Sequence, residues 1–121
     1  MFVNFSNHPS DGWPREQKEK AIEMGNEIVD IAFPNVKTKY TTQDIHNIAE
    51  EYVEKICRMN PDVVMCQGET TLCYSVVTLL KKKGIKVVAA TTERESKEIK
   101  KGDSIKKTSM FKFSGFREYI A

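Results

Sequence analysis

A short polar corner, Gln67 to Thr71, separates an apolar run from a helical pattern. Backbone N–H groups at the start of a helix lack intrahelical partners, and together with the helix dipole they favour an anion. Gly68 permits close approach of the backbone, and Thr70 and Thr71 add hydroxyl donors. The corner therefore predicts a phosphate contact. The structural alternative is that Glu69 or Thr70 only caps the helix, because the corner matches neither the P-loop nor the GxGxxG spacing.

Two other segments carry side chains suited to a nucleotide. His8 is a candidate proton donor or phosphate contact, and Trp13 is a candidate for stacking on a base. Arg94 can make a bidentate contact to a phosphate. Each also has a structural interpretation, with His8 a turn residue and Trp13 a core residue ahead of Pro14. The candidate catalytic residues are His8, Glu69 and Arg94, and the candidate ligand-binding residues are Asn7, Ser10, Trp13, Gln67, Gly68, Thr70, Thr71 and Thr92.

Hydrophobic periodicity predicts the elements that position these residues. Strands are predicted over 2–5, 27–33, 62–66 and 85–91, and helices over 14–25, 41–60 and 70–83. The alternating segment 109–116 predicts a last strand, which we expect to add antiparallel at a sheet edge because no helix precedes it. We interpret the lysine-rich segment 96–107 as an exposed loop with a turn at Gly102-Asp103.

The alternation of strands and helices predicts one α/β domain over residues 1–121. We expect a doubly wound, mainly parallel five-stranded sheet in the order 2-1-3-4-5, with three helices. In such sheets, ligands bind beyond the carboxyl ends of the strands where the strand order reverses. That point lies between the first and third strands, so the loops carrying His8 and Glu69 should meet there, with the loop carrying Arg94 beside them.

Composition limits the possible partners. The net charge of +2, from 19 basic and 17 acidic residues, argues against a stable complex with duplex nucleic acid. No apolar run has the roughly 20 residues that a membrane span needs. Three cysteines without a CxxC pair or a secretion signal indicate reduced thiols in a cytoplasmic protein. With two histidines and no Cys/His cluster, we expect no metal and no cofactor.

Four segments together resemble a known group of proteins: NFSNHPSDGW, QGETT, AATTERE and FKFSGFREY. They are similar to small CRISPR-associated proteins with a Rossmann-like fold, akin to CARF domains and stand-alone ring nucleases, and the similarity covers most of the chain. The resemblance implies a cytoplasmic homodimer in antiviral defence that holds a cyclic oligoadenylate across its two-fold axis. Members that cleave the ring use the ribose 2′-OH without metal and leave a 2′,3′-cyclic phosphate.

Carried onto this chain, the resemblance implies phosphate contacts from Asn7-His8, from Gln67 to Thr71 and from Thr92 to Arg94. We take His8 as the acid/base candidate, and the apolar face of the helix over 70–83 as the dimer seam.

Two other functions are consistent with the sequence. One is transfer or hydrolysis at an N-glycosidic bond, as in deoxyribosyltransferase-like proteins, with Glu69 as the nucleophile. The chain lacks the paired Asp residues in the first strand loop that this chemistry favours. The other is a non-enzymatic dimeric adaptor that binds a protein through its apolar helix face and through Phe111, Phe113 and Phe116.

Overall fold

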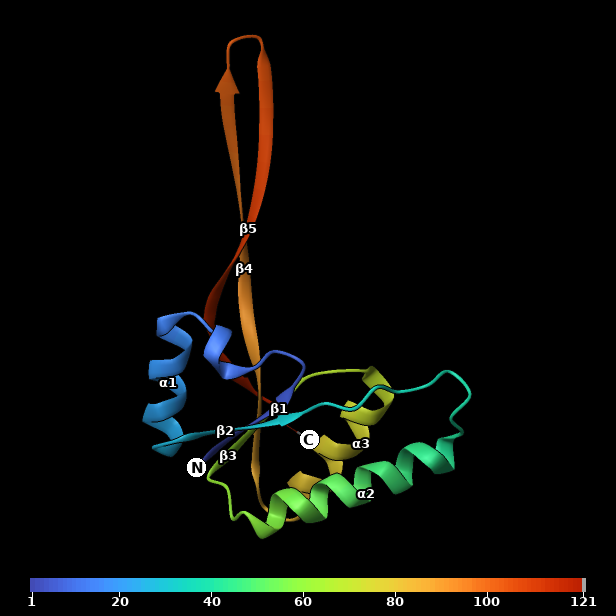
Figure 1. Ribbon diagram of the computed structural model, residues 1–121. Helices are drawn as coiled ribbons and strands as arrows, with labels where there is room; N and C mark the ends of the chain where they lie inside the picture. Colours follow the sequence, from blue (N-terminus) through green and yellow to red (C-terminus); the bar gives the residue numbers. More distant parts are fainter. Residues whose placement is uncertain (121) are drawn as a thin grey trace.

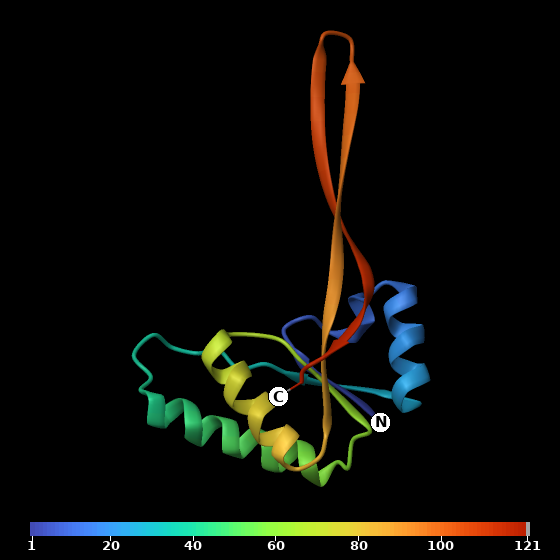
Figure 2. The same ribbon diagram turned by 180° about the vertical axis from the view of Figure 1, so that it is seen from behind.

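A five-stranded sheet with helices on both faces carries a long hairpin that projects from one edge (Figures 1 and 2). This computed structural model describes residues 1–120. In chain order the elements are β1 (Phe2–Ser6), a 3-10 turn (Ser10–Gly12), α1 (Arg15–Gly25), β2 (Ile28–Ala32), α2 (Thr42–Arg58), β3 (Val63–Cys66), α3 (Thr70–Lys82), β4 (Lys86–Lys101) and β5 (Ser104–Glu118).

The predicted strand order is confirmed. The sheet runs β2-β1-β3-β4-β5, with β1 parallel to β2 and β3, and β3 parallel to β4. The last strand, β5, is antiparallel to β4, as the missing helix between them predicts. Because β1 and β3 are adjacent and parallel, the loops that follow them leave the sheet at the same edge.

The sheet separates two hydrophobic clusters, and helices cover each of them. On one face α1 covers a cluster that includes Phe2, Trp13 and Met65. On the other face α2 and α3 cover a larger cluster, which contains Val3 and Phe5 of β1 together with buried residues of the two helices and of the other strands. All four residues of β3 are buried, which agrees with its lack of hydrophobic alternation.

The prediction that the apolar face of α3 forms a dimer seam needs correction. Its apolar residues Leu72, Cys73, Val76, Val77 and Leu80 are buried within the chain. They pack in the cluster that α2 also covers, so this face is already used by the monomer. A dimer would have to use another surface.

The loop predicted over 96–107 is wrong, because β4 and β5 continue through it as a two-stranded arm. Pairing runs from Val88↔Glu118 to Lys101↔Ser104, with a bulge between Thr91 and Thr92. The predicted exposure and the predicted turn are confirmed: residues 96–107 are exposed, and Gly102 has φ +60° at the turn. Side chains on both faces of the arm are exposed and most of them are polar, so the segment 96–107 has no regular hydrophobic alternation and its sequence resembles that of a loop.

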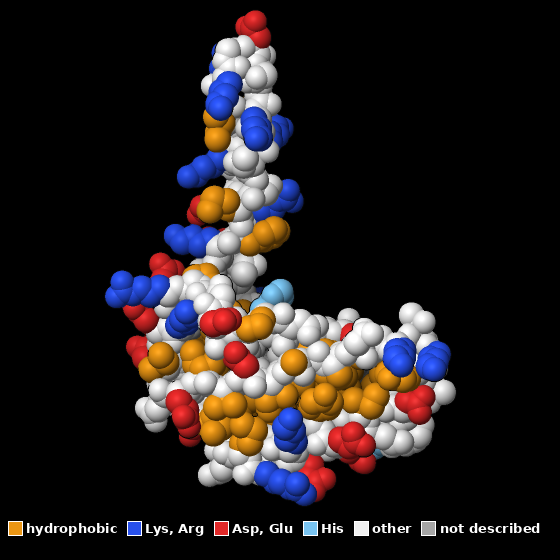
Figure 3. Space-filling view, in the orientation of Figure 1, with side chains coloured by type: hydrophobic (Ala, Val, Ile, Leu, Met, Phe, Trp, Pro, Cys, Tyr) orange, Lys and Arg blue, Asp and Glu red, His pale blue; other side chains and the backbone are white. Residues whose placement is uncertain are grey.

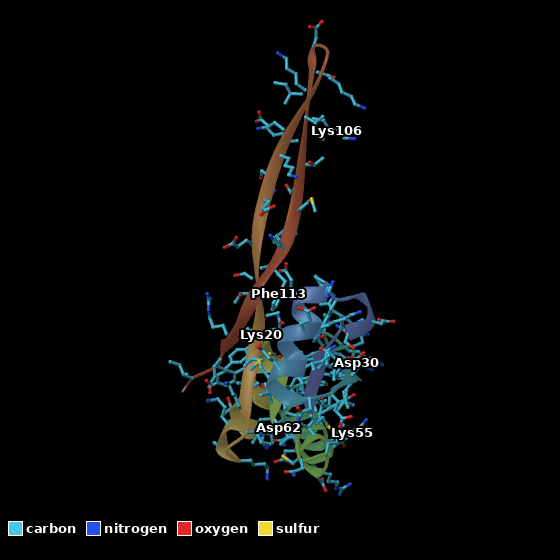
Figure 4. The ribbon with its side chains drawn as sticks, turned by 90° about the vertical axis from the view of Figure 1, so that its left-hand side faces the viewer. Lys20, Asp30, Lys55, Asp62, Lys106 and Phe113 are labelled. Carbon is cyan, nitrogen blue, oxygen red and sulfur yellow. The ribbon has the colours of Figure 1, made fainter. Side chains whose placement is uncertain are left out.

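Lysine and arginine side chains line the arm, whereas hydrophobic side chains form a band across the body (Figure 3). Figure 4 places Phe113 at the base of the arm and Lys106 near its tip. Within residues 1–120, no helix is long and apolar enough to cross a bilayer.

Candidate functional site

A surface depression of about 430 Å³ lies where β3 ends and α3 begins. It is lined by Gln67, Gly68, Thr70, Cys73, Tyr74, Val77 and Tyr119. Two further depressions share residues with it. One of about 460 Å³ continues along α3 and the C-terminal segment, and one of about 690 Å³ extends toward the start of α2. The C-terminal end of the chain lies beside α3 (Figure 2).

The first two residues of the polar corner hold the sheet and the core together. The Gln67 side-chain oxygen Oε1 accepts a hydrogen bond from the Ala90 backbone N–H at 2.9 Å, which ties the exit of β3 to β4. At Gly68 a Cβ atom would lie 2.6 Å from three atoms of the Phe33 ring. The close approach predicted for Gly68 therefore exists, and the group that approaches is a core side chain.

Glu69 is the N-cap of α3, as the structural alternative proposed. Its carboxylate accepts hydrogen bonds from the backbone N–H groups of Thr71 at 3.0 Å and Leu72 at 2.8 Å. The Thr71 hydroxyl donates to both carboxylate oxygens. These bonds hold the pKa of Glu69 below its ordinary value, with the Leu72 N–H as the largest cause. Two of the helix donors expected to bind phosphate are thus occupied by the chain's own anion.

Two thiols and a tyrosine meet behind this cap. The Cys66 and Cys73 sulfur atoms are 3.6 Å apart, and both residues are buried. The Tyr119 hydroxyl donates to the Cys66 backbone oxygen at 3.0 Å and lies 3.9 Å from the Cys73 sulfur. Burial raises the pKa of the Tyr119 hydroxyl further above its ordinary value.

Hydrogen bonds between side chains and the backbone hold the loop after β1 in place. The His8 backbone oxygen accepts hydrogen bonds from Asn4 Nδ2 and from Trp13 Nε1, both at 2.9 Å. Ser10 donates its backbone N–H and its hydroxyl to Asp30 Oδ2, at 3.0 and 3.1 Å. The imidazole of His8 is exposed at this edge.

The prediction that Trp13 stacks on a base is wrong for this structure. The residue is 7% exposed and packs edge-on against Phe2, with ring centroids 6.2 Å apart. The indole N–H is already bonded to His8. Trp13 is therefore a core residue that orders the loop, as its structural interpretation proposed.

The segment that carries Thr92 and Arg94 lies away from the loops that follow β1 and β3. Thr92 and Arg94 lie within β4 and not in a loop, so they stand on the arm. Arg94 is four residues beyond Ala90, which corresponds to about 13 Å of extended chain. Its Nη2 donates at 3.0 Å to Ser109, a residue paired with Ser96 nearer the tip. The guanidinium is thus directed along the arm, and Arg94 does not lie beside the loops that carry His8 and Glu69, which corrects the prediction that it would.

Of the predicted site residues, the depression brings together Gln67, Gly68 and Thr70. Asn7, His8, Ser10, Trp13, Thr92 and Arg94 are not among its lining residues. Tyr74, Cys73 and Tyr119 were missed. The Cys66–Cys73 spacing from a strand end to the first turns of a helix was a usable signal, whereas nothing local in the sequence places Tyr119 beside them.

Comparison with known proteins gives a family. The model of the group described as "Uncharacterized protein MJ1673 family" matches residues 1–117. Neither a curated protein nor a solved structure matches the chain.

Replacing Gly68 with Ala should destabilise the fold, because the new methyl group would overlap the Phe33 ring. We expect a loss of about 1–3 kcal/mol in the free energy of unfolding, measured by urea denaturation. Gly12→Ala is the matched control, since no atom lies within 4 Å of its Cβ position. Equal stability of the two variants would contradict the packing role of Gly68.

Replacing Glu69 with Gln should remove a charge that stabilises the start of α3. We expect a loss of about 0.3–1 kcal/mol at pH 7. Because the folded-state pKa is lowered, this contribution is present above the unfolded pKa of about 4.3 and is lost as the pH falls toward the folded value.

Urea denaturation of both proteins at neutral and acidic pH measures this difference. Glu51→Gln, on the exposed side of α2, should have little effect at either pH. A difference between wild type and Glu69→Gln that is the same at pH 7 and in acid would refute a role for the charge.

Proposed function

We propose that this chain, which belongs to the MJ1673 family, is a cytoplasmic, Rossmann-like, doubly wound nucleotide-binding domain. The observation that carries this proposal is the depression at the end of β3. It begins at Gln67 and Gly68, in the loop that leaves β3 beside β1, and runs from there along α3 to Tyr119. Open α/β sheets bind ligands where the strand order reverses, which in this sheet is between β1 and β3.

The groups that recognise the nucleotide are aromatic and hydroxyl side chains. Tyr74 is 72% exposed, and its ring and that of Tyr119 both line the depression. Aromatic faces stack on bases with little regard to their identity, at about 1–3 kcal/mol for each base. The Thr70 hydroxyl supplies a donor for ribose or phosphate beside the rings.

We take a cyclic oligoadenylate as the ligand class, on the strength of the resemblance in the motifs QGETT and AATTERE. The distribution of charge along the chain supports a polyanionic ligand. Residues 92–113 carry seven Lys and Arg against four Asp and Glu, a net charge of +3, which leaves −1 for the rest of the chain out of a total of +2. A basic projection of this kind raises the local concentration of an anionic ligand.

A homodimer belongs to the same proposal, since a cyclic ligand matches a two-fold axis. The surface available for it is the outer side of α3 and not its buried face. Tyr74 and Ile120 are 72% and 84% exposed there and line one depression with Val77 and Tyr119. The resemblance also implies cleavage of the ring by its own 2′-OH, but His8, the acid/base candidate, does not line this depression, so the depression supports binding of the ring and not its cleavage.

A nucleotide that binds this depression should raise the melting temperature of the protein by several degrees at saturation. A dye-based melting screen with cyclic tetra-adenylate, cyclic hexa-adenylate, AMP and ATP measures this. Tyr74→Ala should weaken binding roughly tenfold or more, because one stacking face is lost. Phe111→Ala is the matched control, since this aromatic residue is equally exposed at 71% but lies on the arm. Unchanged melting temperatures across the panel would reject the proposal.

The second candidate function, a dimeric adaptor, is favoured by the arm. Four of its apolar side chains are 47–71% exposed, namely Ile99, Ile105, Met110 and Phe111. The ribbon packs on no core of its own, and an isolated two-stranded ribbon is only marginally stable in water. Of the three phenylalanines first considered, only Phe111 is free to contact a partner, because Phe113 and Phe116 stack on each other and are partly buried.

Shortening the arm tests this candidate. Glu95 and Met110 are directly paired, so an Asn-Gly turn can join them in place of residues 96–109. The body should melt within a few degrees of the full chain, because the removed residues belong to neither core cluster. Self-association measured by sedimentation equilibrium should be lost. A shortened chain that associates as strongly as the full chain would exclude the arm as the dimer contact.

A further inference from the structure

The two buried thiols at the junction of β3 and α3 are close enough to react with each other. The Cys66 and Cys73 sulfur atoms are 3.6 Å apart, and the Cys73 sulfur is also 3.5 Å from the Cys66 backbone oxygen. A disulfide bond measures about 2.05 Å. The sulfur atoms must therefore approach by about 1.5 Å for the bond to form.

Access to the pair is asymmetric. Cys73 lines the depression of about 430 Å³ and is 8% exposed, whereas Cys66 is fully buried beneath it. A small molecule in the depression can thus reach the Cys73 sulfur and not the Cys66 sulfur. Gly68 and Thr70 line the depression together with Cys73.

The chemistry of the pair follows the same asymmetry. The hydrogen bond from Cys66 lowers the pKa of Cys73, and the Tyr119 hydroxyl adds to this effect. The same contact and burial raise the pKa of Cys66. Cys73 therefore reacts first as a thiolate, and Cys66 follows.

We propose that Cys66 and Cys73 form a reversible redox site that exchanges with a low-molecular-weight disulfide held in the depression. The Cys73 thiolate attacks one sulfur of the small disulfide, forms a mixed disulfide and releases one small thiolate. Cys66 then loses its proton to that thiolate and attacks the Cys73 sulfur, which expels the second small thiolate; this thiolate takes up from solvent the proton that Cys73 had released. Two protein thiols are oxidised to one disulfide, and one small disulfide is reduced to two thiols.

The test uses the reduced full chain and glutathione disulfide as the probe. After incubation the remaining thiols are alkylated, and the protein is digested with trypsin and a Glu-specific protease. Cleavage after Arg58, Glu69 and Lys81 separates Cys57, Cys66 and Cys73 into different peptides. We expect peptides 59–69 and 70–81 to remain joined until a reductant is added, with Cys57 alkylated. Peptides that separate with both cysteines alkylated would overturn the proposal.

Single substitutions separate the two roles. Cys66→Ser should stop the reaction at a mixed disulfide, with one glutathione on Cys73. Cys73→Ser should leave Cys66 unmodified. Cys57→Ser is the matched control and should form the internal disulfide as the wild type does, because this cysteine lies on α2 away from the pair. Glutathione on Cys66 in Cys73→Ser would refute the order of attack. The wild-type digest needs no variant, so a folding failure in a variant does not affect it.

Discussion

The four-residue strand β3 is the constraint from which the rest of the structure follows. It pairs with β1 on one side and β4 on the other, and all its side chains are buried. Because all four side chains of β3 are buried, the polar contacts at its end come from the residues that follow it. Within three residues, Gln67 to Glu69, the chain must bond to β4, make room for the Phe33 ring and satisfy the first N–H groups of α3.

This constraint explains the composition of the polar corner. Gln67 bonds to the backbone of β4, Gly68 makes room for Phe33, and Glu69 satisfies the first N–H groups of α3. The residue types that suggest a phosphate site therefore already have partners within the chain, at the junction of β3 and α3. The groups left to meet a ligand are those one turn further along, Thr70 and Tyr74, together with Tyr119 from the end of the chain.

The arm separates charge from the body. Beyond the bulge at Thr91 and Thr92, its strands are held by backbone pairing and a few exposed side-chain contacts such as the hydrogen bond from Arg94 to Ser109, while the body is held by two buried clusters. Lysines are favourable on such a ribbon because they keep its edges from pairing with other strands. The same lysines make the arm the basic part of a nearly neutral chain, and the function proposed above relies on that charge to attract an anion.

The sequence by itself determined the elements of the body, because amphipathic stripes such as that of α2 and breakers such as Pro61 and Gly84 act locally. It also determined the strand order, since parallel crossovers allow few arrangements. Only the tertiary structure decided that 96–107 is a ribbon, because backbone pairing between polar strands leaves no hydrophobic pattern. It also decided which polar groups are free. The polar groups of Trp13, Gln67 and Glu69 are bonded within the chain, and residue type alone does not show that these bonds form. Nor does it show that Cys73 contacts Tyr119, which lies 46 residues away along the chain.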